Sequence, residues 1–159
     1  KIIAEDLGFI TPDVKELLEF TGYPGMKILQ FAFYDEDAEF LPRMYKTSNC
    51  VVYTGSHDAD CTYTWIKNIE GDAKKRFKKE CLDKTTYKGV YAMIYLALSS
   101  TANLSIIPIQ DYLCLTNEEG RMNTPSTAEG NWVWRVKKES INQDLINKIK
   151  KITIQTNRD

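Results

Sequence analysis

The chain has 159 residues, of which 43% are hydrophobic and 27% are charged, a composition typical of a globular domain and not of a disordered, collagenous or coiled-coil protein. Lysine and arginine total 21 against 22 aspartates and glutamates, so the net charge of −1 does not favour a nucleic-acid partner. No apolar run approaches the roughly 18 residues that a membrane helix needs, so no membrane partner is expected.

The cysteines do not form a metal-binding or disulfide pattern. They lie too far apart for a C-x-x-C motif, and the single His57 cannot complete a usual Cys/His zinc site. No signal peptide is recognised, so we expect buried, reduced thiols and a cytoplasmic location. The four positions are Cys50, Cys61, Cys81 and Cys114.

The first half of the chain is predicted to alternate strands and a helix. Residues 1–6 are interpreted as a short buried strand that ends on acidic residues. A Thr-Pro pair at Thr11 indicates a helix start, and Gly22 indicates its end. Residues 26–33 and 51–54 are predicted as further strands. Because chain ends seldom form core strands, we expect further residues upstream of residue 1.

The second half is predicted to contain three helices, a strand and a final helix. Asp60 and Asp72 can cap the first two helices, and residues 86–99 form an apolar third. Residues 104–109 are predicted as a fourth strand. A capping-box pattern that begins at Ser140 opens the last, amphipathic helix.

The aromatic residues are assigned mainly to the core. Trp65 is expected in the core, as are Tyr91 and Tyr95, which are four positions apart on one predicted helix. For Trp132 and Trp134 we favour packing beneath the mouth of a functional site over stacking on a ligand.

The order of strands and helices predicts an α/β fold with a parallel sheet covered on both faces. About four such units amount to half of a (β/α)8 TIM barrel, which runs to about 250 residues when whole. Residues 1–159 are therefore interpreted as one partial barrel domain, its C-terminal half; an open four-stranded sheet is the alternative. Three predicted strands end on polar pairs, and strand ends of this kind face the active-site mouth of a barrel. The pairs begin at Glu5, His57 and Gln110.

Glu5 and Asp58 follow different predicted strands, so a barrel would direct both carboxylates into one cleft. Two convergent carboxylates suit cleavage of a glycosidic bond, because one donates a proton and another stabilises the positive charge that develops. The alternative is that these carboxylates cap helices and loop amides. His57 lies in a Gly-Ser-His-Asp turn, where an apolar packing role is not expected.

A series of longer motifs runs through the chain in order. They are AEDLG at 4–8, ITP at 10–12, PGMK and LQFAF within 24–33, YTGSHD at 53–58, IPIQD at 107–111, RMNTP at 121–125, and GNW and WR within 130–135. Together these motifs closely resemble the amylomaltase family, the 4-α-glucanotransferases or disproportionating enzymes of the α-amylase clan. The resemblance covers residues 1–136 and points to starch and glycogen metabolism.

The resemblance implies retaining α-1,4-glucan transfer through a covalent intermediate, without a redox or nucleotide cofactor and without a catalytic metal. It assigns Glu5 as the general acid/base and Asp58 as the carboxylate that stabilises the transition state. The substrate-binding residues that it implies are Asp6, Phe31, His57 and Asn123.

The resemblance also has a gap. The family's nucleophilic aspartate lies on an earlier strand, and no aspartate of this chain matches it; Ser56 and Ala59 stand where the family usually has Thr and Asn. The chain alone is therefore expected to be inactive. Its expected partners are a maltooligosaccharide or α-glucan substrate and either the N-terminal half of the barrel or a second copy. The alternatives are a non-catalytic half-barrel that binds oligosaccharide and a hydrolase of the same clan; a plastid location is expected for a plant or algal source.

Overall fold

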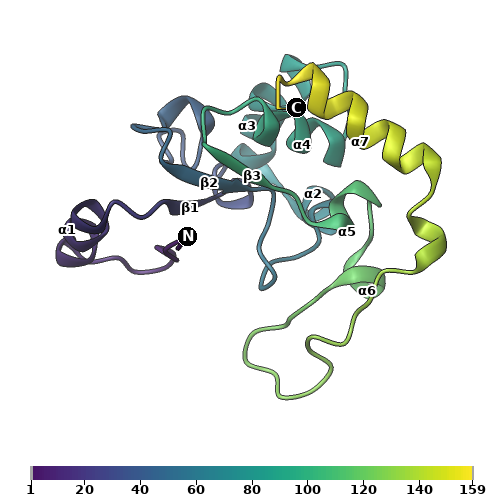
Figure 1. Ribbon diagram of the computed structural model, residues 1–159, viewed down its shortest axis with the longest axis horizontal. Coiled ribbons are helices and arrows are strands. Elements are labelled where there is room, and N and C mark those ends of the chain that lie inside the picture. Colours follow the sequence, from purple (N-terminus) through teal and green to yellow (C-terminus); the bar gives the residue numbers. More distant parts are fainter. Residues whose placement is uncertain (1, 159) are drawn as a thin grey trace.

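A parallel sheet lies at the centre of the molecule, whose computed structural model describes residues 2–158 (Figure 1). Within these residues the sheet has three strands, β1 (Gly25–Ile28), β2 (Cys50–Tyr53) and β3 (Leu104–Ile106), and β2 lies in the middle. Met26 is opposite Val51, and Val51 is opposite Leu104. The α/β class and the parallel pairing are thus confirmed, with one strand fewer than predicted.

The sheet is less completely covered than the sequence predicts. Ile28 and Val52 are fully buried, as continuous apolar strands of a parallel sheet should be. On β3, however, Leu104 and Ile106 remain partly exposed. The prediction of a sheet covered on both faces is therefore not met at β3, where these two side chains are only partly covered.

Helices connect and flank the strands. Their bounds are α1 (Pro12–Thr21), α2 (Thr62–Asn68), α3 (Gly71–Glu80), α4 (Val90–Leu98), α5 (Ile109–Tyr112), α6 (Asn117–Gly120) and α7 (Gln143–Gln155). Short 3-10 turns occupy Leu29–Phe31, Pro42–Met44, Leu82–Lys84 and Lys138–Ser140. In Figure 1, α3, α4 and α7 lie on one side of the sheet and α1 projects away from it.

The main core is built around three aromatic rings. Phe33, Trp65 and Phe77 lie with ring centroids 5.4 to 5.7 Å apart, in tilted and edge-to-face arrangements that aromatic rings prefer. All three are buried, so the prediction that Trp65 belongs to the core is confirmed. These contacts join the turn after β1 to α2 and α3.

A second core joins α4 to α7. Ile152 of α7 is fully buried against Val90, Ile94 and Leu98. Beyond the helix, the guanidinium of Arg158 donates hydrogen bonds of 2.6 to 2.8 Å to the carbonyl oxygens of three residues. These are Leu98, Ser100 and Ala102, so Arg158 supplies partners for the end of α4 and the turn after it.

The predicted strand over residues 1–6 does not form within the part of the chain that is described. One backbone hydrogen bond joins this segment to the sheet region, from the Ala4 amide to the Pro24 carbonyl at 2.9 Å. Ile2 is 56% exposed and Ile3 is also exposed. An apolar sequence becomes a strand only through a ladder of hydrogen bonds to a neighbouring strand, and a single bond does not supply one.

Other elements are shorter than predicted. Residues 26–33 are divided between β1 and the 3-10 turn that follows it, where the Ala32 amide donates to the Leu29 carbonyl at 2.9 Å. A continuous apolar run does not reveal this change in backbone geometry. The helix predicted over 86–99 begins at Val90, because Gly89 takes a positive φ of 53° immediately before it.

Several caps lie elsewhere than predicted. Cys61 and Glu70, not Asp60 and Asp72, precede α2 and α3. The last helix is capped by Asn142, whose side chain accepts a 3.0 Å hydrogen bond from the Leu145 amide, so the prediction at Ser140 is wrong. Asp60 is not available as a cap because its carboxylate is bound by side chains described below.

The cysteine and tyrosine predictions hold in part. All four cysteines are free; Cys50, Cys61 and Cys81 are buried, and Cys114 is half-buried. Tyr91 and Tyr95 are half-buried against the second core. Among residues 2–158, no helix has the length and apolar character needed to span a membrane.

Candidate functional site

The loop that follows the carboxyl end of β2 carries His57 and Asp58. His57 Nε2 lies 3.3 Å from Asp58 Oδ2, and each side chain is about half exposed. Asp58 Oδ1 accepts a 2.5 Å hydrogen bond from Asn123 Nδ2, although Asn123 lies in a distant part of the sequence. The structure thus brings three of the predicted site residues into one cluster, with both oxygens of Asp58 engaged.

Both ends of this loop are attached to one buried carboxylate. Asp111, in α5 directly after β3, accepts a hydrogen bond from the Thr54 hydroxyl, and it accepts two from Thr62, one from the hydroxyl at 2.8 Å and one from the backbone amide at 3.2 Å. Burial raises the pKa of Asp111, and the hydrogen bonds from Thr54 and Thr62 oppose that rise. Thr54 and Thr62 therefore hold the loop between them at a fixed place on the sheet.

Gln30, in the turn after β1, binds the same loop from the other side. Its Nε2 donates to the Asp60 carbonyl at 2.8 Å and to the Thr62 hydroxyl at 3.2 Å. A side chain at Gly55 would place its Cβ 2.5 Å from Gln30 Nε2, closer than atoms can approach. The buried Gln30 side chain therefore requires glycine at position 55.

The segment around α6 is tied to the loop by Asp60. The Asp60 carboxylate forms an ion pair with Arg121 and accepts a 2.8 Å hydrogen bond from Asn117 Nδ2. Asn117 Oδ1 in turn accepts from the Cys61 amide at 2.8 Å. The Arg121 guanidinium also donates to the carbonyl oxygens of Asn123 at 3.0 Å and Asp58 at 3.3 Å.

Trp132 lies beside His57 and not in the protein interior. Its side chain and backbone are 54% exposed, and its indole ring is centred 4.8 Å from the imidazole ring of His57. Its backbone φ is 62°, and its amide donates to the Met122 carbonyl at 2.8 Å. The prediction that Trp132 packs beneath the mouth is therefore wrong, whereas Trp134 is partly buried.

A cavity of about 210 Å³ lies between the loop that follows β2 and the segment around α6. This volume is below the range of about 300–1,000 Å³ common for small-molecule sites. Side chains from both loops line it, among them His57, Asp60, Gln110, Arg121, Met122 and Trp132.

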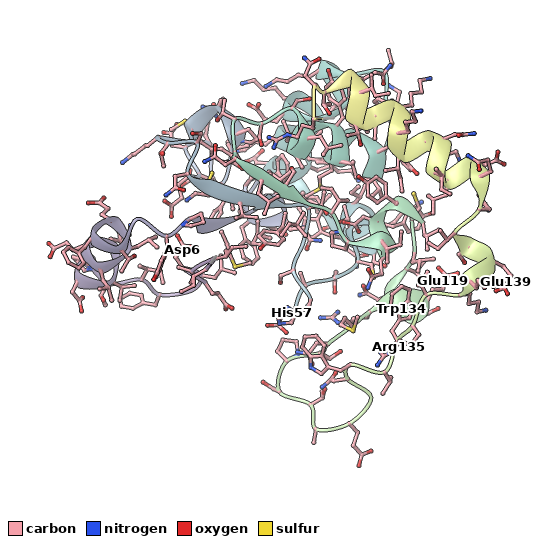
Figure 2. All side chains as sticks on the ribbon, viewed as in Figure 1. Asp6, His57, Glu119, Trp134, Arg135 and Glu139 are labelled. Atoms are coloured by element: carbon pink, nitrogen blue, oxygen red, sulfur yellow. The ribbon has the colours of Figure 1, made fainter. Side chains whose placement is uncertain are left out.

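Glu5 and Asp6 are not brought to this cluster. Glu5 is exposed, and Asp6 Oδ1 accepts a 2.6 Å hydrogen bond from the Met26 amide. This places residues 4–6 at the amino end of β1, whereas His57 follows the carboxyl end of β2; Figure 2 shows Asp6 near α1 and well apart from His57. The predicted convergence of Glu5 and Asp58 is therefore not present, because the segment that carries Glu5 is not paired as a strand.

Phe31 follows the carboxyl end of β1, the same edge of the sheet as the loop of His57. Its ring is 43% exposed and makes an edge-to-face contact with Phe40, with the centroids 5.7 Å apart. Phe31 therefore lies at the same edge of the sheet as His57 and remains partly exposed.

The described residues do not suggest metal or thiol chemistry. Within residues 2–158, no three His, Cys, Asp or Glu side chains lie close enough together to hold a metal ion. Cys61 borders the cavity, but burial and the nearby Asp111 raise its thiol pKa to about 11. A thiol that is protonated at neutral pH is a poor nucleophile.

Three residues of the site were given no specific role in it from the sequence. Arg121 and Asp111 belong to the motifs quoted above without an assigned role, and Asp60 was interpreted as a helix cap. The signal for Arg121 was its place two residues before Asn123. The signal for Asp111 was an acidic residue close to the end of an apolar strand. The sequence does not reveal whether such a side chain is exposed or buried.

Comparisons with known proteins agree on one family. A family model described as 4-alpha-glucanotransferase matches residues 1–141. The 4-alpha-glucanotransferase of Streptococcus pneumoniae serotype 4 is 43% identical over 141 residues, which cover 88% of this chain and 28% of that protein. The enzyme of the same name from Clostridium butyricum is 43% identical over 155 residues, which cover 96% of this chain and 31% of that protein.

A solved structure agrees with these relatives. The amylomaltase from Streptococcus agalactiae, determined in complex with acarbose, superposes with a TM-score of 0.90 at 32% identity. The superposition covers 98% of this chain and 32% of that chain. This chain therefore spans less than a third of the length of these relatives.

Proposed function

Since this chain belongs to the 4-alpha-glucanotransferase family, we propose that the enzyme containing it transfers α-1,4-glucan segments between maltooligosaccharides. The observation that carries this proposal is the cluster of Asp58, His57 and Asn123 at the carboxyl end of a parallel strand. A carboxylate, an imidazole and an amide together match the hydroxyl groups of a sugar ring as hydrogen-bond partners. We assign the enzyme to the cytoplasm, or to the plastid in a plant or alga.

We propose that the sheet is part of a (β/α)8 barrel, of which residues 1–159 form the C-terminal half. Two observations support this proposal: the three strands are parallel and follow one another in sequence order, and polar residues follow their carboxyl ends. The exposed Leu104 and Ile106 on β3 would then contact further strands of the barrel wall. A second copy of the chain covering that edge is the alternative.

In this proposal Glu5 is the general acid/base of a retaining mechanism. Glu5 would donate its proton to the leaving glycosidic oxygen while a carboxylate nucleophile, to which no residue of this chain is assigned, bonds to the anomeric carbon. The acceptor hydroxyl then gives its proton back to Glu5 and replaces the nucleophile at that carbon. The role needs residues 2–7 to pair as a strand beside β1, which would move Glu5 to the carboxyl edge and bury the exposed Ile2 and Ile3.

The remaining roles follow from position. Asp58 would stabilise the positive charge on the sugar in the transition state, and His57 and Asn123 would bind hydroxyls of the same sugar. Phe31 is partly exposed, and an aromatic ring suits the C–H face of a glucose unit. Asp6 would bind sugar after the same movement that places Glu5, since it would then release the Met26 amide.

The test is to incubate the full-length enzyme with maltotriose and to follow both the product lengths and the number of reducing ends. Each transfer breaks one α-1,4 bond and forms another, so glucose and longer oligosaccharides should appear while the number of reducing ends stays constant. An increase in reducing ends would identify a hydrolase instead. The 159-residue chain alone should give no turnover, because the nucleophile is not assigned to it.

A further inference from the structure

We propose that Arg121 is a positioning residue that fixes Asp58 and Asn123 relative to each other, a role that rests on the function proposed above. Arg121 lies directly after α6, and its guanidinium reaches the loop that follows β2. It does not touch the cluster through the side chains of Asp58 and Asn123. It holds the backbone carbonyl of each of them.

The contacts form a closed circuit. Arg121 Nε donates to the Asn123 carbonyl at 3.0 Å, and Nη2 donates to the Asp58 carbonyl at 3.3 Å. The circuit is completed by the side chains, since Asn123 Nδ2 donates to Asp58 Oδ1 at 2.5 Å. A displacement of either loop would therefore break contacts on both sides of the Asp58–Asn123 hydrogen bond at once.

The ion pair with Asp60 orients the guanidinium of Arg121. Arg121 Nη1 binds Asp60 Oδ1, and Asn117 Nδ2 holds the same oxygen at 2.8 Å. A guanidinium is planar and presents five N–H donors in fixed directions, so it can serve one carboxylate and two carbonyls together. A lysine ammonium could keep the ion pair, but it cannot reach both carbonyls in the same plane.

The circuit has a direct consequence for catalysis. Catalytic groups must be held to a fraction of an ångström, and a misplacement of about 1 Å can cost roughly a hundredfold in rate. Within residues 2–158, Arg121 donates no hydrogen bond to the side chains expected to touch the sugar, so its loss should reduce the accuracy of their placement more than the strength of substrate binding. Turnover should fall more than the affinity for maltotriose.

Arg158 supplies a matched control. Its guanidinium also donates to backbone carbonyls, those of Leu98, Ser100 and Ala102, but at the end of α4 and away from the cluster. Arg121→Lys and Arg158→Lys therefore remove the same chemistry from two places. A general effect of losing an arginine that binds carbonyls should appear in both variants, whereas a positioning effect should appear only at Arg121.

The first measurement does not depend on activity. Hydrogen exchange of the full-length enzyme, read in peptides over residues 55–61 and 121–132, should be at least about tenfold faster in Arg121→Lys than in wild type or in Arg158→Lys. Unchanged exchange in both peptides would overturn the proposal, even if the wild-type enzyme proved not to transfer glucans. If the wild-type enzyme showed no glucan transfer, only the proposed function would be overturned, and the positioning role of Arg121 would still be tested by the exchange rates.

The second measurement is kinetic. In maltotriose disproportionation, Arg121→Ala should lower kcat by about 10- to 100-fold with KM changed less than threefold, and added guanidinium ion should restore part of the rate. Arg121→Lys should fall between Arg121→Ala and wild type, and Arg158→Lys should keep the wild-type kcat. A rise in KM alone, or an equal loss of kcat in Arg158→Lys, would overturn a positioning role.

Discussion

The N-terminal segment and the loop after β2 are organised in opposite ways. The helix α1 forms from local signals alone, with Pro12 at its start and Gly22 at φ 66° after its end, yet none of its residues is buried. The loop of His57 has little regular structure, but Asp111, Gln30 and Arg121 attach it to three other parts of the chain. Local signals can thus build a helix without placing it, whereas a functional loop is placed by contacts that are distant in sequence.

The largest expected effect is on turnover, at Glu5, because the proposed mechanism needs the N-terminal segment to reach the loop after β2. Glu5→Gln in the full-length enzyme should lower kcat for maltotriose disproportionation by about 10²- to 10⁴-fold with little change in KM, because the amide cannot donate or accept the proton that moves in each step. Glu16→Gln, an exposed position on α1, is the control and should keep wild-type turnover. Near-normal turnover of Glu5→Gln would remove the N-terminal segment from the mechanism.

Two phenylalanines sharpen the contrast in packing. Phe77 is 2% exposed and Phe20 is 88% exposed. In this chain, Phe77→Ala should lower the free energy of unfolding by about 3–5 kcal/mol, whereas Phe20→Ala should change it by less than about 0.5 kcal/mol. Denaturant unfolding of both variants measures the difference. A large loss in Phe20→Ala would show that α1 is covered by another surface in solution.

The buried carboxylate of the loop should leave a signature in the pH dependence of stability. Asp111 has its pKa raised by burial, so the folded state retains its proton to a higher pH than the unfolded state, whose aspartate pKa is about 3.9. The stability of wild type relative to Asp111→Asn should therefore fall as the pH rises above about 3.9, by at most about 1.4 kcal/mol per pH unit, and level off above the folded pKa. Thermal unfolding across pH tests this; a difference that grows with pH would mean a lowered pKa.

The smallest expected effect is on stability, and it concerns the side-chain cap at the start of α7. Asn142→Ala should destabilise the chain by about 1 kcal/mol, because the Leu145 amide at the start of α7 loses its side-chain acceptor. Lys150→Ala, at an exposed position in the same helix, is the control and should have a smaller effect. Equal losses in the two variants would contradict a specific role of the Asn142 cap.

The sequence predicted those features that depend on neighbouring residues. The bounds of α1 were predicted to within one residue from Thr11, Pro12 and Gly22, and β2 was predicted from the β-branched run at 51–54. Both predictions succeed because capping and strand propensity act over a few positions. The pairing of His57 with Asp58 was likewise readable, since the two are adjacent. Asn123 came from the resemblance, and its contact with Asp58 was not predicted.

What could not be predicted depends on long-range partners. Residues 1–6 have the composition of a strand, but the described residues 2–6 lack the ladder that would make them one. Asp60 looks like a helix cap until Arg121 and Asn117 occupy its carboxylate, 61 and 57 positions along the chain. Trp132 is held beside His57 by a backbone turn in which Trp132 itself takes a positive φ, a conformation that a tryptophan in the sequence does not predict. Each of these depends on a partner that the local pattern does not contain.

The attachment of both loop ends to one carboxylate makes the fold tolerant of changes in the length of this loop. Thr54 and Thr62 meet at Asp111, so the intervening residues 55–61 begin and end at nearly the same point in space. The free energy of closing such a loop changes slowly with its length, by about 0.6 kcal/mol for each doubling. The loop between the two threonines can therefore change in length at little cost in closure entropy, as long as Asp60 and Cys61 keep their contacts with Arg121 and Asn117.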